Sequence, residues 1–253
     1  GLSAITLLAA AATPGIDGYS GSAYARDDGR LLYREQHWSY QQHGQPRQLV
    51  LYTCPDGRPF ARKQLRGPLD SSDPDFDLVD ARNGYREGAH KHNGKLQVYV
   101  QENARAKRRS ETLPLKSDAV IDAGFDAYVH THWDALGHSD ATVPFLLPSH
   151  LGYIDIRLND ATGTREDGQA VRKLRMRLAA WYGFAVPAIH LTYSLRGHRL
   201  MRFEGIGTIR DAHGDNQNVR IEFPADARHR DVPQVQLQRA LSEPLNGRCG
   251  ASA

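Results

Sequence analysis

The 253-residue chain has few of the residues and motifs that usually reveal a chemistry. It holds two cysteines, Cys54 and Cys249, and no CxxC motif, which argues against a thiol redox centre or a cysteine-rich zinc site. In an oxidising compartment the two cysteines could form a disulfide, and otherwise they are a small core residue and a tail thiol. The GxSxG and HExxH motifs are absent, and the GxG at Gly205–Gly207 has no third glycine. The sequence therefore predicts no cofactor and no metal site, and it identifies no reaction.

Hydrophobic runs long enough to cross a bilayer, about 20 residues, are also lacking, so no transmembrane span is predicted. The apolar run Leu2–Ala12 has the length of the central part of a signal peptide. Ala10–Ala12 supplies small residues for a cleavage site, although a basic segment before the run is missing. We therefore expect residues 1–18 to be a signal-peptide-like leader and the protein to be exported to the periplasm. A short buried first helix is the alternative.

An excess of one charge is lacking too, since 32 basic and 29 acidic side chains give a formal net charge of +3. Nucleic-acid-binding proteins concentrate basic residues on one face, whereas here both signs are interspersed, so no nucleic-acid partner is predicted. The exception is a basic run formed by Arg105, Lys107, Arg108 and Arg109. This run is either a solvated loop or a contact to the anionic headgroups of membrane lipids.

Short strands separated by turn signals dominate the rest of the chain. Asp27–Gly29, Pro55–Gly57 and Asn83–Gly84 fall between apolar segments, and Asn-Gly is the strongest short-range signal of a hairpin. Apolar and polar residues alternate along many of these segments, which is typical of strands with one buried face. The sequence predicts a single β-rich domain over residues 19–224, followed by a polar C-terminal tail over residues 225–253.

One segment has helical rather than strand periodicity. Phe125, Tyr128, His132 and Leu136 recur at the spacing of one helix face, which predicts an amphipathic helix over about residues 118–136. A sheet that curls around this helix would bury the apolar face. The predicted fold class is therefore mainly β, a strongly curled antiparallel sheet or open β-barrel with one main helix.

Two segments, 191–224 (LTYSLRGHRLMRFEGIGTIRDAHGDNQNVRIEFP) and 120–136, resemble blocks of exported proteobacterial hypothetical proteins of unknown function. The layout of strands and helix also resembles the lipocalin-like and lipoprotein-carrier-like periplasmic proteins. Those are partly open antiparallel barrels that bind acyl chains or lipidated peptides. The first resemblance implies export and a barrel-like fold, and neither carries catalytic residues over to this chain.

The leading hypothesis is a periplasmic binding or carrier protein for an apolar or lipid-like ligand. The candidate lining residues are Phe125, Tyr128, His132 and Trp133 on the helix, and Ile154, Ile156, Leu174 and Met176 on strands. The same residues could equally form plain core. His132 distinguishes the two cases, because it would point at a ligand in a cavity but would need one hydrogen-bond partner in a dry core.

Two other functions stay open. The first is an enzyme of unrecognised type that uses His130 or His132 together with Asp126 or Asp134. A catalyst requires titratable groups with perturbed pKa values that converge in a cleft. The second is a structural assembly factor of the cell envelope, in which the helix face packs completely.

Overall fold

The computed structural model describes residues 15–166, 168–180, 183 and 186–250. Within these residues one antiparallel sheet contains the strands β1 (Asp17–Ala25), β2 (Leu31–Gln42), β3 (Gln45–Thr53), β4 (Pro59–Arg66), β5 (Asp75–Asp80), β6 (Tyr85–His92), β7 (Lys95–Gln101), β8 (Arg109–Pro114), β9 (Ala141–Leu147), β10 (Gly152–Glu166), β11 (Gln169–Leu178), β12 (Ile189–Ser194), β13 (Leu200–Arg210), β14 (Asn216–Glu222) and the short β15 (Arg228–His229). The helices are α1 (Gly124–Thr131), α2 (Trp133–Leu136) and α3 (Gln234–Ser242).

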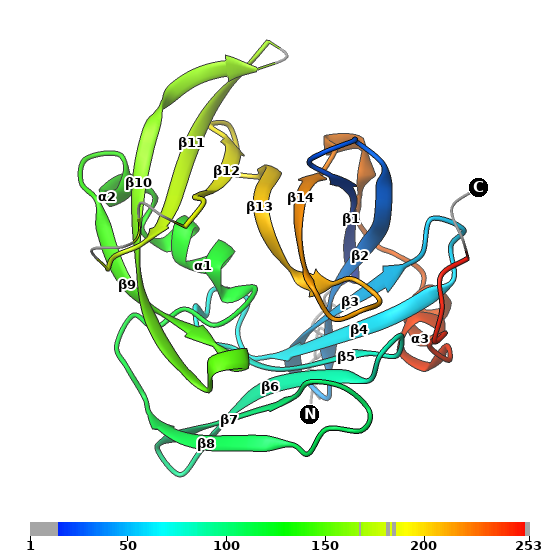
Figure 1. Cartoon of the computed structure of the whole chain (residues 1–253). Helices are drawn as coiled ribbons and strands as arrows, with labels where there is room; N and C mark the ends of the chain where they lie inside the picture. The colour runs from blue at the N-terminus through cyan, green and yellow to red at the C-terminus, as the bar shows by residue number, and fades with distance from the viewer. Residues whose placement is uncertain (1–14, 167, 181–182, 184–185, 251–253) are drawn as a thin grey trace, which may run out of the picture.

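The sheet curls strongly but does not close, as Figure 1 shows. Its order is β8-β7-β6-β5-β4-β3-β2-β1-β14-β13-β12-β11-β10-β9, so β8 and β9 are the two edges. Neighbours in the sheet are neighbours in the chain except at β1, which pairs with β14 and, at its start, with β15. This arrangement confirms the predicted fold class.

Tight turns set the register of two hairpins. His43–Gly44 and Asn93–Gly94 have positive φ at both positions, with values from 50° to 72°, as a two-residue type I′ turn requires. The Asn83–Gly84 pair instead ends a longer loop, in which the Gly84 amide donates to the Asp80 carbonyl. The hairpin predicted there is present, with a different turn.

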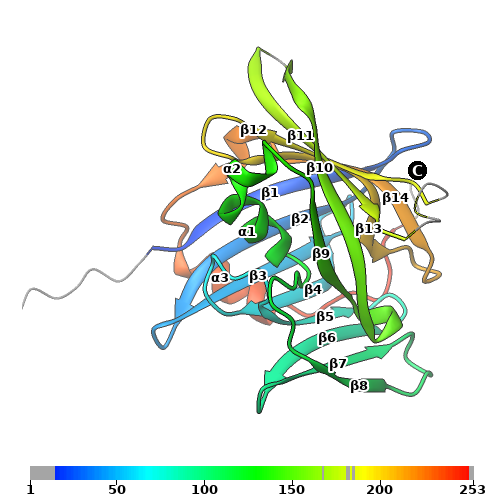
Figure 2. The same ribbon diagram turned by 90° about the vertical axis from the view of Figure 1, so that its left-hand side faces the viewer.

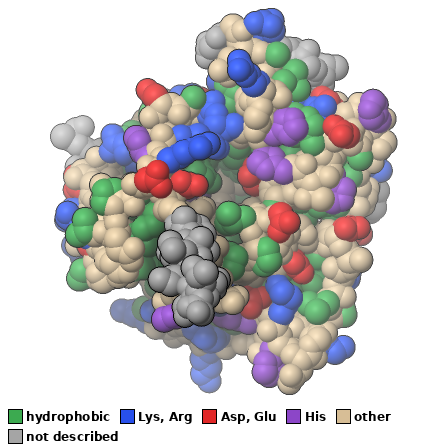
Figure 3. All heavy atoms as spheres, turned by 180° about the vertical axis from the view of Figure 1, so that it is seen from behind, with side chains coloured by type: hydrophobic (Ala, Val, Ile, Leu, Met, Phe, Trp, Pro, Cys, Tyr) green, Lys and Arg blue, Asp and Glu red, His purple; other side chains and the backbone are tan. Residues whose placement is uncertain are grey.

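Two apolar clusters fill the concave side. The larger one joins β1–β7, β13 and β14 through residues such as Tyr33, Phe60 and Phe76. The second joins α1 and α2 to β9–β12, with Trp133 and Leu174 among its members. Figures 1 and 2 show α1 and α2 on the inner side of the curled sheet. Side chains of both charges are interspersed over the face drawn in Figure 3.

The helix on the concave side is shorter than the predicted range of about 118–136. Asp118 and Asp122 have φ of 57° and 46°, values that an α-helix excludes, so helical backbone begins only at Gly124. At His132 the φ of −104° separates α1 from α2. The segment before α1 is instead anchored to the 71–74 loop, where the Ile121 amide donates to the Ser72 carbonyl over 2.9 Å.

The C-terminal segment packs on the outer side of the sheet. Leu237 and Ala240 of α3 are buried against Trp38 and Leu49. Arg62 of β4 donates to the carbonyls of Ala240 and Glu243, which satisfies the end of α3.

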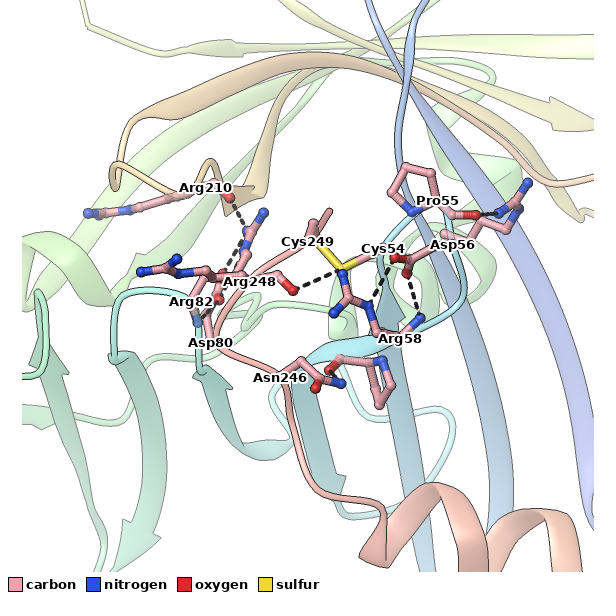
Figure 4. The surroundings of a disulfide bond; sticks show 12 residues. Cys54, Pro55, Asp56, Arg58, Asp80, Arg82, Arg210, Asn246, Arg248 and Cys249 are labelled. Atoms are coloured by element: carbon pink, nitrogen blue, oxygen red, sulfur yellow. Dashed lines mark hydrogen bonds and ion pairs between the residues drawn. A yellow bond between two sulfur atoms is a disulfide. The ribbon is translucent and has the colours of Figure 1, made fainter. Parts of the chain in front are cut away.

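A disulfide between Cys54 and Cys249, with 5.3 Å between their Cα atoms, ties the segment to the end of β3. Figure 4 shows this bond beside the Asp56–Arg58 and Asp80–Arg82 pairs. The structure thus settles the pairing that the sequence left open.

Of the predicted leader, residues 1–18, positions 1–14 lie outside the described residues, and its last two positions, Asp17 and Gly18, begin β1. In the described part of the chain, every helix is too short or too polar to cross a bilayer.

Candidate functional site on the concave face

Strand alternation places two ionisable side chains of β2 on the concave side. Tyr33 is fully buried there, and residues two apart share a face, so Glu35 and His37 face the same way. Glu35 is 7% exposed. Its Oε1 lies 2.8 Å from Nε2 of His37. A carboxylate and an imidazole therefore form a close pair in a largely water-excluded position.

The hydrogen bond assigns the proton on His37. A carboxylate only accepts, so Nε2 of His37 donates to Glu35, and when the ring is neutral Nδ1 carries the free lone pair. Among the described residues neither His37 Nδ1 nor Glu35 Oε2 has a hydrogen-bond partner, and neither atom is fully enclosed. Both atoms can therefore accept a hydrogen bond from a ligand.

Aromatic rings and a cation surround the pair. The Tyr19 ring stacks on His37 with 4.2 Å between centroids and an interplanar angle of 11°. Phe223 meets both rings edge-on, with centroid distances of 6.0 and 6.2 Å. The Arg228 guanidinium lies 5.3 Å from the Tyr19 centroid. We call Tyr19, Glu35, His37, Phe223 and Arg228 the concave-face cluster.

The first helix faces this cluster with a carboxylate. The Tyr193 hydroxyl donates to Asp126 over 2.9 Å. Burial raises the pKa of both Tyr19 and Tyr193, and the negative charge of Asp126 raises each further. The three side chains, from α1, β1 and β12, therefore point into one region of the concave side.

A buried ion pair lies deeper on the same side. Lys63 Nζ is 2.9 Å from Asp122 Oδ1, and the two side chains are 6% and 5% exposed. Burial alone would lower the pKa of Lys63, but the charge of Asp122 and the neighbouring Tyr52 outweigh it, so the pKa is raised. The pair joins β4 to the segment that leads into α1, and it positions the helix against the sheet.

Glu87, also on the concave side, is partly protonated near neutral pH. Burial raises its pKa from 4.5 to about 7, while a hydrogen bond from Tyr85, 2.6 Å long, acts in the opposite direction. Asp122 raises this pKa further. The concave side therefore holds titratable groups with strongly altered proton affinities.

The structure brings the predicted lining residues together, but as packed side chains. Tyr128, Trp133, Ile156 and Leu174 are buried members of the second apolar cluster, and Phe125, Ile154 and Met176 pack against it while partly exposed. The ring of His132 stacks on Tyr128 at 4.0 Å, and its Nδ1 donates to the Tyr128 carbonyl over 3.0 Å. This is the single partner that a core histidine requires.

The predicted histidine–carboxylate pairs are looser than the Glu35–His37 pair. His130 lies 3.8 Å from Asp126 and donates to the His198 carbonyl. Asp134, like His130, is exposed.

The basic run lies away from the concave-face cluster. Arg108 stacks on Tyr99 at 4.2 Å, and Arg109 pairs with Glu102 at 3.4 Å. Arg105 and Lys107 make no ion pair with any described residue. Together with His90, Tyr99, Ser110 and Thr112, Arg108 lines a shallow hollow of about 520 Å³.

A second carboxylate–imidazole pair, Asp77 and His90, contrasts with the first. Asp77 Oδ1 accepts from His90 Nε2 over 2.9 Å, but Arg66 donates to His90 Nδ1 over 3.0 Å. Both ring nitrogens are therefore occupied, and His90 cannot serve as a base without losing a contact. His37 differs because its Nδ1 is free of protein partners in the described structure.

No motif or spacing in the sequence singled out Glu35 and His37. The alternation along β2 puts Tyr33, Glu35 and His37 on one face, but Trp38 on the opposite face is buried as well, so the pattern did not mark the pair. Comparison with known proteins adds no assignment: no protein-family model matches the chain, and no curated protein matches it. The candidate site therefore stands on its geometry.

Proposed function

We propose that this protein is an exported, periplasmic binding or carrier protein for an amphipathic, lipid-like ligand whose polar end contacts the Glu35–His37 pair. The observation that carries the proposal is the pair of free acceptor atoms, Glu35 Oε2 and His37 Nδ1, beside a cation and aromatic rings. A ligand hydroxyl, amide or protonated acid would donate to these atoms, and an anionic group would be attracted to Arg228.

Half-buried apolar side chains supply the other part of the site. Leu200 and Phe203 of β13 pack against both apolar clusters while keeping some exposed surface. Phe125 of α1 is also partly exposed. Covering such surface contributes about 25 cal/mol per Å² of apolar area removed from water. An apolar chain therefore gains most against these residues, and the fully buried Leu174 serves as support.

The disulfide supports the exported location. Structural disulfides persist in oxidising compartments and are rare in the cytosol. Cys54 and Cys249 form one over a sequence separation of 195 residues. The unpaired Arg105 and Lys107 fit a protein that contacts anionic lipid headgroups.

The test is native mass spectrometry of protein purified from an exporting host, followed by solvent extraction and lipid identification. We expect a stoichiometric ligand on the wild type and its loss from the double variant Glu35→Gln/His37→Ala. The matched control is Glu111→Gln/His213→Ala, which alters an exposed glutamate and an exposed histidine elsewhere. A ligand-free wild type that takes up neither fatty acids nor phospholipids would contradict the proposal.

A second candidate function, an acid–base enzyme, is favoured by the same pair. A general base needs a free lone pair within reach of substrate and an orienting partner, and His37 with Glu35 meets both conditions. We propose His37 as the base in that case. Turnover by the wild type that is lost in His37→Ala, while the fold is kept, would favour the enzyme over the carrier.

A further inference from the structure

Three arginines project from one surface of β10 and β11, the long hairpin at the upper end of the sheet in Figure 1. Leu158 and Leu174 are buried on the concave side, so Arg157, Arg175 and Arg177 point to the outer side. The register places Arg157 directly opposite Arg177. Arg175 is two residues from Arg177 on the same strand face. We call these three residues the outer arginine patch.

The protein does not neutralise this patch. None of its three guanidinium groups forms an ion pair with a described residue, and the closest polar contact is a 3.4 Å bond from Arg175 to the Asn159 side chain. Asp155 is exposed and shares the outer side with Arg157, yet it pairs with neither Arg157 nor Arg177.

Other cations on β11 and β13 are paired. Lys173 contacts Glu166 at 2.6 Å, and Arg202 contacts Glu166 and Glu222 at 3.0 and 2.8 Å. Carboxylates are therefore available to cations in this part of the sheet, yet in the described structure they leave the arginines of the outer arginine patch unpaired.

The arrangement carries a cost in the free protein. Like charges directly across a strand pair are destabilising. In addition, Arg177 Nε is one of two buried side-chain nitrogens without a hydrogen-bond partner among the described residues. A buried donor left unsatisfied opposes folding. A bound oxyanion would relieve the repulsion between Arg157 and Arg177.

We propose that the outer arginine patch binds a phosphate group, as free phosphate or pyrophosphate or as the phosphate of a lipid headgroup. Guanidinium groups bind phosphate oxygens through paired, charge-assisted hydrogen bonds. Facing positions on neighbouring strands are about 5 Å apart and next-but-one positions on a strand about 7 Å apart, so one phosphate can bridge Arg157 and Arg177. Arg175 can then contact a second phosphate or the same group. This site is separate from the concave-face cluster and does not depend on the function proposed for it.

The test compares the full-length wild type with Arg157→Gln/Arg175→Gln/Arg177→Gln. The matched control is Arg26→Gln/Arg86→Gln/Lys95→Gln. It also removes three positive charges, but from exposed positions that form no ion pair with a described residue. Pyrophosphate binding is measured by calorimetry at low salt. Vesicle binding is measured by flotation with phosphatidylglycerol–phosphatidylcholine vesicles and with phosphatidylcholine vesicles alone. Thermal unfolding of each variant, with and without pyrophosphate, checks the fold.

We expect the patch variant to bind at least about tenfold more weakly than the wild type, and the control to stay within about twofold, since hydrogen bonds between charged groups carry the affinity. Binding of pyrophosphate would assign a soluble phosphate ligand. If the protein binds phosphatidylglycerol vesicles but does not bind pyrophosphate, the ligand is a lipid headgroup. Absence of both from the wild type, or equal losses in patch variant and control, would overturn the proposal. A patch variant that unfolds at a lower temperature than the control would also overturn it, because the patch would then be structural.

Discussion

The buried pair of Lys63 and Asp122 should control both the stability of the fold and the position of α1. Replacing Lys63 by Met leaves the Asp122 carboxylate, 5% exposed, without its cation. Breaking a buried ion pair from one side typically costs about 3 to 5 kcal/mol. The Asp122 carboxylate keeps one other contact, since its Oδ2 accepts from the Ala123 amide over 2.6 Å. We therefore expect a loss near the lower end of that range.

The assay is equilibrium unfolding in urea for the wild type, Lys63→Met, Asp122→Asn and the double variant. Each single variant leaves one buried charge without its partner, whereas the double variant leaves none. The double variant should therefore be more stable than the sum of the single losses predicts, by about 2 kcal/mol or more. The control pair is Arg58 and Asp56, 48% and 47% exposed, for which Arg58→Met should cost at most about 1 kcal/mol. Equal costs for Lys63→Met and Arg58→Met, with additive double variants, would refute the reasoning.

Three further predictions concern the framework around the site. Reducing the Cys54–Cys249 disulfide frees a loop of 195 residues, and in the chain-entropy account this lowers the free energy of unfolding by about 5 kcal/mol; an unchanged urea midpoint with reductant would contradict it. The pKa of Glu87 is about 7 in the folded protein, against an ordinary value of 4.5. Between pH 4.5 and 7 the folded state therefore keeps a proton that the unfolded chain has lost, and the free energy of unfolding should fall as pH rises across that window. Glu87→Gln should remove that fall, and an identical pH profile in the variant would show that another group is responsible. A Cβ at Gly124 would lie 2.1 Å from the Ser72 carbonyl oxygen, so Gly124→Ala should cost about 3 kcal/mol; an unchanged melting temperature would exclude this close approach.

The sequence predicts strands well where one face is apolar and a turn limits each end. In β7, buried Leu96, Val98 and Val100 alternate with more exposed residues, as in a strand with one buried face, and Asn93–Gly94 forms the turn before it. The strand β8 was missed, because Arg109–Thr112 is exposed along its length and has no alternation to detect. This edge strand is held by pairing with β7, by packing of Leu113 against the larger apolar cluster, and by a hydrogen bond from Tyr153 to the Pro114 carbonyl.

Long-range geometry limited the prediction of the site. The apolar spacing predicts a helix over 118–136, but the segment before Gly124 is held by contacts to Ser72 and Lys63, which are distant in sequence. The pairing of Glu35 with His37 is local in sequence, but both faces of β2 carry a buried aromatic residue, Tyr33 and Trp38, so the alternation does not mark the pair. Its neighbours Phe223 and Arg228 come from the far end of the chain, and no local pattern places them there.

The pairing of β1 with β14 has a consequence for how the chain folds. Ser22 lies beside Glu222 in this ladder, so the contact joins parts of the chain separated by 200 residues, the difference between the two numbers. A ribosome that adds about 5 to 20 residues per second needs roughly 10 to 40 s to make that length. During this time the free side of β1 exposes unsatisfied amides and carbonyls that favour intermolecular pairing. Contacts of such long range also fold slowly. The topology therefore predicts that incomplete or slowly folding chains associate through β1.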